Sequence, residues 1–143
     1  ASITPSGKPW GTPVYCAFNE DLNFFWASWK LNQHSKNIRN NSSVFVTIYD
    51  STVPAGTGVG IYFEGKAYEL NNPKDILSGI KVIYKREKRK PREVIQFLKK
   101  FPRRIYKFVP EKAWINGDGE IEGSYIDVRT ELDLNKLKLA ISK

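Results

Sequence analysis

Residues 24–50, FFWASWKLNQHSKNIRNNSSVFVTIYD, predict two strands joined by a short polar helix. The aromatic run Leu22–Ser28 suits a pleated, half-buried surface, and the β-branched alternation of Ser43–Tyr49 predicts a second strand. The segment between them, 33–41, is rich in hydrogen-bond donors and contains the only histidine, His34. Free N–H groups and the dipole at a helix start favour an anion. The segment is therefore either a phosphate-binding site or a solvated surface helix.

The rest of the chain alternates short β-type segments with turn residues, and its helical periodicity is confined to a few places. Strands are predicted at Thr12–Phe18, Ile61–Leu70, Ile105–Val109, Ala113–Asn116 and Tyr125–Glu131. Helices are predicted from Pro73, capped by Asn72, to about Tyr84, from Pro91 to about Phe101, and over Leu134–Ile141. Gly65, inside a strand, predicts a bulge. These elements predict a mainly β fold, a small antiparallel barrel with peripheral helices.

The length and composition fit one globular domain over residues 1–143. Hydrophobic residues make up 41% of the 143, and the apolar runs are too short to span a bilayer. Cys16 is the only cysteine, so no intrachain disulfide forms and a reducing, cytoplasmic compartment is expected. The chain begins mid-pattern and without methionine, so we expect a few N-terminal residues of the natural protein to be absent.

The net charge of +8 is concentrated in one region. Residues 81–107 hold twelve Lys or Arg and two acids, and they overlap a predicted helical basic insert at about 73–101. Clustered cations neutralise phosphates, and small barrels bind single strands by stacking, which would suit a nucleic acid. The lysines also fall on the polar sides of two amphipathic helices. A solvated face is the favoured interpretation, and a nucleic-acid partner is the lesser alternative.

Several kinds of catalytic site are excluded by residue content. One histidine and one cysteine, without a carboxylate cluster, do not make a metal site. His34 beside Ser35 has no nucleophile-elbow sequence, and residues 56–60 lack the strand-then-helix context of a dinucleotide loop. No catalytic residue is assigned.

The order of five segments resembles the pyridoxamine 5′-phosphate oxidase-like family, the FMN-binding split barrels. These segments are Gly7–Pro9, Thr12–Tyr15, Phe24–Ser28, Gln33–Ile38 and Gly65–Ala67. The resemblance covers residues 1 to about 70 and continues loosely to Glu131. It implies a six-stranded antiparallel split barrel and a homodimer with one FMN in each of two interface grooves. It also implies a flavin-dependent oxidoreductase that exchanges hydride or electrons with a small or nicotinamide-type substrate.

The resemblance also implies roles for individual residues. The isoalloxazine ring would lie along the first strand segment, Thr12, Pro13, Val14 and Tyr15. The ribityl chain and phosphate would lie near the strand end, Trp26, Ala27 and Ser28. The phosphate itself would be held at the helix start by Gln33, His34, Lys36 and Asn37. Trp114 and Arg129 would face the groove from the second subunit, although a core tryptophan and an arginine paired with Glu131 are simpler interpretations.

Two departures from the family pattern affect these expectations. Many relatives carry lysine where this chain has Gln33-His34, so FMN affinity is expected to weaken as His34 loses its proton. The last third of the chain contains Tyr125–Arg129 and lacks the Arg-x-His element of the true oxidases. This argues against pyridoxine phosphate oxidation. F420 or FAD in place of FMN, a non-catalytic flavin carrier or sensor, and a nucleic-acid-binding barrel remain open, and the substrate is unnamed.

Overall fold

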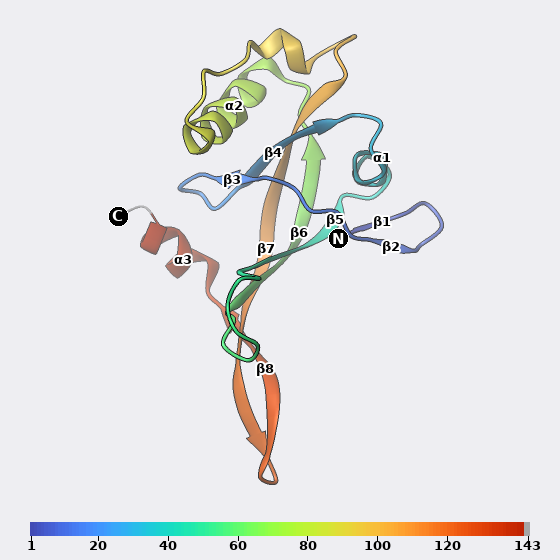
Figure 1. The fold of residues 1–143 in the computed structure, drawn as a ribbon. Coiled ribbons are helices and arrows are strands. Elements are labelled where there is room, and N and C mark those ends of the chain that lie inside the picture. Colours follow the sequence, from blue (N-terminus) through green and yellow to red (C-terminus); the bar gives the residue numbers. More distant parts are fainter. Residues whose placement is uncertain (142–143) are drawn as a thin grey trace.

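The computed structural model describes residues 1–141, and its body is a six-stranded antiparallel sheet (Figure 1). The strand order is β3 (Ala17–Phe18), β4 (Phe24–Trp29), β7 (Arg103–Ile121), β6 (Gly60–Glu69) and β5 (Ser43–Tyr49), with β8 (Ser124–Leu132) paired to β7. A separate two-stranded ribbon is formed by β1 (Ser2–Ile3) and β2 (Pro9–Trp10). The mainly β, six-stranded antiparallel architecture expected from the sequence is confirmed.

Within residues 1–141, three α-helices and one short 3₁₀ helix flank the sheet. Their bounds are α1 Gln33–Asn40, α2 Pro73–Glu87, η1 Val94–Phe97 and α3 Leu134–Ile141. The start of α2 is as predicted, because the Asn72 side chain accepts the backbone N–H of Lys74 at 2.8 Å and Pro73 occupies the first turn. Among residues 1–141, no helix has the length and apolar character needed to cross a membrane.

The core has two parts because neighbouring residues of a strand point to opposite faces. Phe24 packs on one side of the sheet with Phe63 and Phe108, and α1 and α3 add apolar side chains there. Phe25 packs on the other side against isoleucines of α2 and Phe97 of η1. The groove described below opens on the first side, while the basic insert packs on the second.

The predicted bulge at Gly65 is confirmed and explains why β7 is longer than expected. The β6–β7 register shifts between Glu64 and Gly65, and Gly65 then pairs with Pro110. Proline lacks the N–H that a regular ladder needs, so a break was expected between Ile105–Val109 and Ala113–Asn116. The bulge accommodates Pro110 instead, and the two predicted strands are one continuous strand.

Two other predictions were wrong. Thr12–Phe18 was expected to be a strand, but only Ala17–Phe18 pairs, because the preceding residues contain Pro13 and run beside no neighbouring strand. The expected helix from Pro91 to Phe101 is reduced to the four residues of η1. The Arg104 guanidinium donates to the carbonyl oxygens of Lys99, Phe101 and Arg103 at 2.7–2.8 Å and so holds this part of the chain as turns.

Candidate functional site

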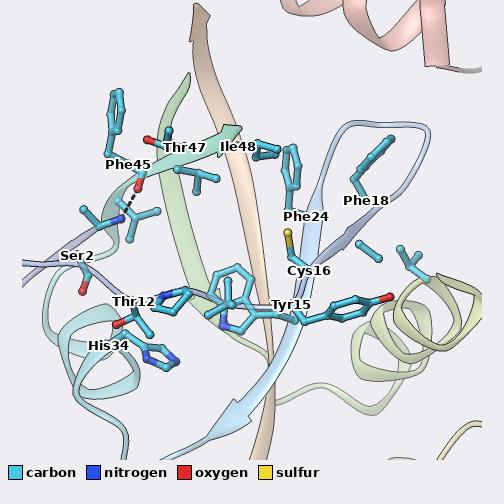
Figure 2. Close-up of a pocket in the computed structure, with 18 of the residues that line it drawn as sticks. Ser2, Thr12, Tyr15, Cys16, Phe18, Phe24, His34, Phe45, Thr47 and Ile48 are labelled. Atoms are coloured by element: carbon cyan, nitrogen blue, oxygen red, sulfur yellow. Dashed lines mark hydrogen bonds between the residues drawn. The ribbon is translucent and has the colours of Figure 1, made fainter. Parts of the chain in front are cut away.

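A large groove lies where the sheet remains open. In the strand order given above, β3 and β5 stand at the two ends, and they do not pair with each other among the described residues. The space between them has a volume of about 1490 Å³ and is lined by residues 10–21, the length of β5, part of α1 and the end of α2. Figure 2 shows Thr12 and His34 on one side of this groove and Phe18 and Tyr15 on the other. Its size exceeds that of a usual small-molecule pocket.

The irregular segment 11–16 crosses the groove and brings together four of the residues predicted to contact a cofactor ring. These are Thr12, Pro13, Val14 and Tyr15, which all line the groove. Within the described chain, the backbone groups of Thr12, Val14 and Tyr15 form no hydrogen bond with protein atoms. The segment therefore offers free backbone donors and acceptors to a bound molecule. Its far end is fixed by Arg86, which lies over the Tyr15 ring at 4.9 Å and donates to the carbonyl oxygen of Cys16.

Two buried polar atoms in the groove have no partner in the described structure: the hydroxyl oxygen of Thr12 and the indole nitrogen of Trp26. Trp26 is only 7% exposed, and its ring stacks on Tyr106 with the ring centroids 5.5 Å apart. Buried polar groups in native proteins are nearly always paired, and each unmade hydrogen bond costs about 1–3 kcal/mol. Both residues line the groove. These two atoms mark the place where a ligand with hydrogen-bonding atoms fits.

His34 sits at the start of α1 and lines the groove beside them. Its Nε2 lies 2.9 Å from the hydroxyl of Ser28, which also accepts a hydrogen bond from the Asn32 side chain at 3.0 Å. Burial lowers the pKa of His34 below its ordinary value of 6.5, so the ring is neutral at pH 7. Because the Asn32 side chain bonds Ser28, α1 starts without a side-chain cap on its first N–H groups.

The other residues predicted to hold phosphate are placed differently. The Gln33 side chain donates to Asn37 at 2.8 Å, and Asn37, which is fully buried, donates to the hydroxyl of Ser2 at 3.0 Å. These bonds fasten α1 to β1. Lys36 is exposed on α1 and does not line the groove. His34 is thus the only one of the four that lines it.

Trp114 and Arg129 lie together, away from the groove of their own chain. Trp114 stacks on Phe45 with the ring centroids 6.3 Å apart, and the Arg129 guanidinium lies 4.1 Å from the centre of the Tyr62 ring. Arg129 forms no ion pair with Glu131 in the described structure. Ala27 packs on the α2 side of the sheet. That Trp114 and Arg129 face the groove of a second subunit stays a prediction.

Sequence reasoning missed two parts of the groove wall. All of β5 after its first residue, from Val44 to Tyr49, contributes, as do Lys85 and Arg86 of α2. The alternation of β5 showed that it is a strand with two different faces, but not that its edge stays unpaired. No local signal in α2 indicated that its basic last turn reaches the irregular segment, because that contact joins residues 70 positions apart.

The structure predicts that acidification destabilises the protein through His34. A lowered pKa means that the unfolded chain binds the proton more readily than the folded one. This contribution to stability is complete above pH 6.5, and it is lost as the pH falls from there through the lowered pKa of the folded state. Thermal unfolding of wild type and His34→Gln between about pH 7.5 and 4.5 tests this, around the reference histidine pKa. The variant should lose less stability below pH 6.5; parallel curves would contradict the assignment.

The chain was compared with known proteins by sequence and by structure. No protein-family model matches it, and no curated protein is similar to it in sequence. Solved structures with the same fold include a protein of unknown function from Agrobacterium tumefaciens, with a TM-score of 0.65, 22% identity and 81% of this chain covered. The match spans 48% of that protein, so this chain corresponds to about half its length.

Two other structures connect the fold to proteins named for flavin-type cofactors. A pyridoxamine 5′-phosphate oxidase-related, FMN-binding protein from Nostoc punctiforme matches with a TM-score of 0.54 and 10% identity, over 90% of this chain and 83% of that one. An F420 reductase matches with a TM-score of 0.55 and 16% identity, over 78% and 83%. At these identities the likeness shows the fold alone. The chain has the fold of the pyridoxamine 5′-phosphate oxidase-like barrels.

Proposed function

We propose that the groove binds FMN and that the protein is a flavin-dependent oxidoreductase acting on a small substrate. The observation that carries the proposal is the pair of unpartnered buried atoms, Thr12 Oγ1 and Trp26 Nε1, in the open groove of this fold. An apolar ligand would leave both atoms unpaired. A ligand that combines a large aromatic ring with several hydrogen-bonding atoms satisfies them.

The residues present fit the ring of a flavin. The ring system has an apolar body and a pyrimidine edge with both donors and acceptors. The groove supplies the indole N–H of Trp26, the hydroxyl of Thr12 and the free backbone groups of the segment 12–15. Aromatic side chains that line it, such as Tyr15 and Phe45, offer apolar surface for the body. These groups would hold and orient the ring and exclude water from it.

The phosphate of FMN would be held at the start of α1. The uncapped N–H groups of this helix start, together with Ser28 and His34, form a set of donors for an anion. The neutral state of His34 removes the fixed charge that lysine supplies in many relatives, so backbone donors carry more of the attraction. An adjacent phosphate raises the pKa of a histidine, and FMN binding is therefore expected to be accompanied by proton uptake below about pH 6.5.

When bound, the flavin supplies the redox chemistry, as organic cofactors do in general. The described residues of this chain supply binding and orientation, and none of them is assigned as a general acid or base. The family resemblance also implies a homodimer with the flavin at the interface, and we propose that assembly here as well. F420, which names one protein with the same fold, is the alternative cofactor.

The proposal is tested by adding FMN to the cofactor-free protein. Saturable quenching of flavin fluorescence with one FMN per chain, followed by NAD(P)H-dependent bleaching of the blue absorbance, is the expected result. If FMN is taken up but is not bleached by NAD(P)H or by any other biological electron donor, the oxidoreductase part of the proposal is overturned and a carrier is favoured. Uptake of F420 but not FMN would overturn the choice of cofactor. Failure to bind either would overturn the proposal as a whole.

A further inference from the structure

A row of three side chains crosses the middle of the sheet behind the groove. In the strand pairing, Trp26 of β4 lies directly opposite Tyr106 of β7, and Tyr106 lies directly opposite Glu69 of β6. Directly opposed residues of neighbouring strands project from the same face of a sheet. Of the three, only Trp26 lines the groove, whereas Tyr106 is fully buried behind it. Tyr106 can therefore affect a bound molecule only through its neighbours.

The ring of Tyr106 supports two side chains that line the groove. It stacks on the Trp26 indole with the ring centroids 5.5 Å apart and an angle of 16° between the ring planes. Its centroid lies 6.3 Å from that of the His34 ring, in an edge contact. Such contacts between aromatic rings are favourable beyond the area that they bury. The position of the Tyr106 ring therefore sets the position of the indole.

The hydroxyl of Tyr106 is fixed by Glu69. It donates a hydrogen bond to Glu69 Oε2 at 2.8 Å. Burial, and to a lesser extent the hydrogen bond to Glu69, raises the pKa of Tyr106 well above its ordinary value of 10, so the phenol keeps its proton and remains the donor. The ring is thus held in two places, by the indole at its face and by a carboxylate at its hydroxyl.

Glu69 is itself anchored by two arginines from different parts of the chain. Arg39 of α1 pairs with Glu69 Oε2, and Arg104 of β7 lies 3.5 Å from Glu69 Oε1. Each arginine also donates to backbone carbonyl oxygens, Arg39 to that of Lys30 at 2.6 Å and Arg104 to those of the turns at 99–103. A side-chain network in which each oxygen has a partner is rigid. Glu69 therefore gives Tyr106 a fixed anchor.

The indole that this row supports has an unmade hydrogen bond. Trp26 Nε1 is buried and has no partner within residues 1–141. An indole that was free to turn would move its N–H towards water or a protein acceptor, because an unpaired buried donor is unfavourable. Stacking on a fixed ring opposes that movement. The N–H therefore stays available to a ligand before the ligand arrives.

We propose that Tyr106, anchored by Glu69, is a positioning residue that holds the Trp26 indole in its ligand-binding orientation. A side chain that is already held in its bound orientation loses less conformational entropy on binding, so the affinity is higher. Tyr106 needs no contact with the ligand for this effect. The inference rests on the proposed function for the choice of FMN as the probe, whereas the orientation of Trp26 is measured in the cofactor-free protein.

A double-mutant cycle measures the effect on binding. Tyr106→Phe keeps the ring and removes the hydroxyl. In the otherwise wild-type chain it should raise the Kd for FMN about fivefold, whereas in a chain that already carries Trp26→Phe it should raise that Kd less than about twofold. Tyr68→Phe, at an exposed tyrosine next to Glu69 in β6, is the matched control and should leave the Kd unchanged. A purely structural role would weaken binding equally in both backgrounds, and this result would overturn the proposal.

The second measurement follows the indole without any ligand. The chain has four tryptophans, and the indole N–H signal of Trp26 in a nitrogen–proton NMR spectrum is the one that Trp26→Phe removes. We expect a single sharp signal in the wild type. The signal should be broadened or divided in Tyr106→Phe and Glu69→Ala, because the ring behind the indole is no longer fixed. Glu69→Gln keeps an oxygen that accepts the tyrosine hydroxyl, so it should disturb the signal less than Glu69→Ala does.

The two measurements separate this inference from the proposed function. If the wild type fails to take up FMN, the proposed function is overturned, and the inference is still decided by the NMR signal. A Trp26 signal that is equally sharp in the wild type, Tyr106→Phe and Glu69→Ala would overturn the inference, even if FMN binds. Circular dichroism shows whether each variant remains folded. Glu69→Ala alters a partly exposed side chain and keeps the test available if Tyr106→Phe fails to fold.

Discussion

Gly65→Ala is expected to lower the free energy of unfolding by roughly 3 kcal/mol, at the upper end of what overpacking costs. A Cβ atom at this position would lie 2.2 Å from the carbonyl oxygen of Val109 and 2.9 Å from the Cα of Pro110. Both contacts are with backbone atoms of β7, which cannot turn aside as a side chain does. The clash falls at the bulge that accommodates Pro110, so relief would require breaking the β6–β7 ladder.

Thermal unfolding of this variant beside Gly117→Ala measures the effect. Gly117 lies in the same sheet, and a Cβ there meets no atom within 4 Å. The control should therefore be nearly neutral, whereas Gly65→Ala should unfold at a temperature roughly 10 °C lower. Equal stability of the two variants would show that the bulge can relax, contrary to the tight approach described here.

The second large effect concerns the two unpartnered atoms of the groove, where ligand binding and stability should move in opposite directions. Thr12→Val removes a buried hydroxyl that has no protein partner. The cofactor-free protein should gain about 1 kcal/mol, because a buried unmade hydrogen bond is removed. FMN affinity should fall about tenfold, since one hydrogen bond to the ligand is lost.

Trp26→Phe removes the indole N–H and should likewise reduce FMN affinity about tenfold. Flavin fluorescence titration and thermal unfolding of the cofactor-free proteins give the two measurements. Thr130→Val, an exposed threonine of β8, is the control and should change neither. If Thr12→Val weakened the cofactor-free protein and left FMN affinity unchanged, the hydroxyl would have a structural role and the fit to a ligand would fail.

Elements set by local pattern were predictable from the sequence. β5 and α3 have the predicted bounds, and α1 differs from its prediction by one residue. In β5 the β-branched alternation indicates a strand whatever its neighbours do. Asn72 and Pro73 mark the start of α2 by capping chemistry that acts within one turn. These signals need no knowledge of the rest of the fold.

Elements set by distant contacts were not predictable in the same way. The irregular segment 11–16 has the composition of a strand, but a strand forms only where a neighbour offers its edge. The end of the helix expected from Pro91 was lost to the bonds that Arg104 makes with the carbonyl oxygens of Lys99, Phe101 and Arg103. The continuity of β7 through Pro110 depends on a glycine 45 positions earlier.

The candidate site was predictable as a region rather than as a set of contacts. The resemblance brought together Thr12–Tyr15, Trp26 and His34, and all of them line the groove. It did not show that the Gln33 side chain donates to Asn37, that Asn37 donates to Ser2, or that burial keeps His34 neutral. Such details depend on which side chains reach each other in three dimensions, and the order of residues does not specify them.

The pairing of β7 changes along its length, and this divides one strand among separate cooperative units. From Tyr106 to Phe108 it has both β4 and β6 as neighbours, and beyond Asn116 it has β8 alone. Local unfolding follows such differences in hydrogen bonding and burial. The distal ribbon can therefore fray and re-form while the doubly paired centre stays closed. Motion of the distal β7–β8 ribbon therefore does not disturb the residues that line the groove.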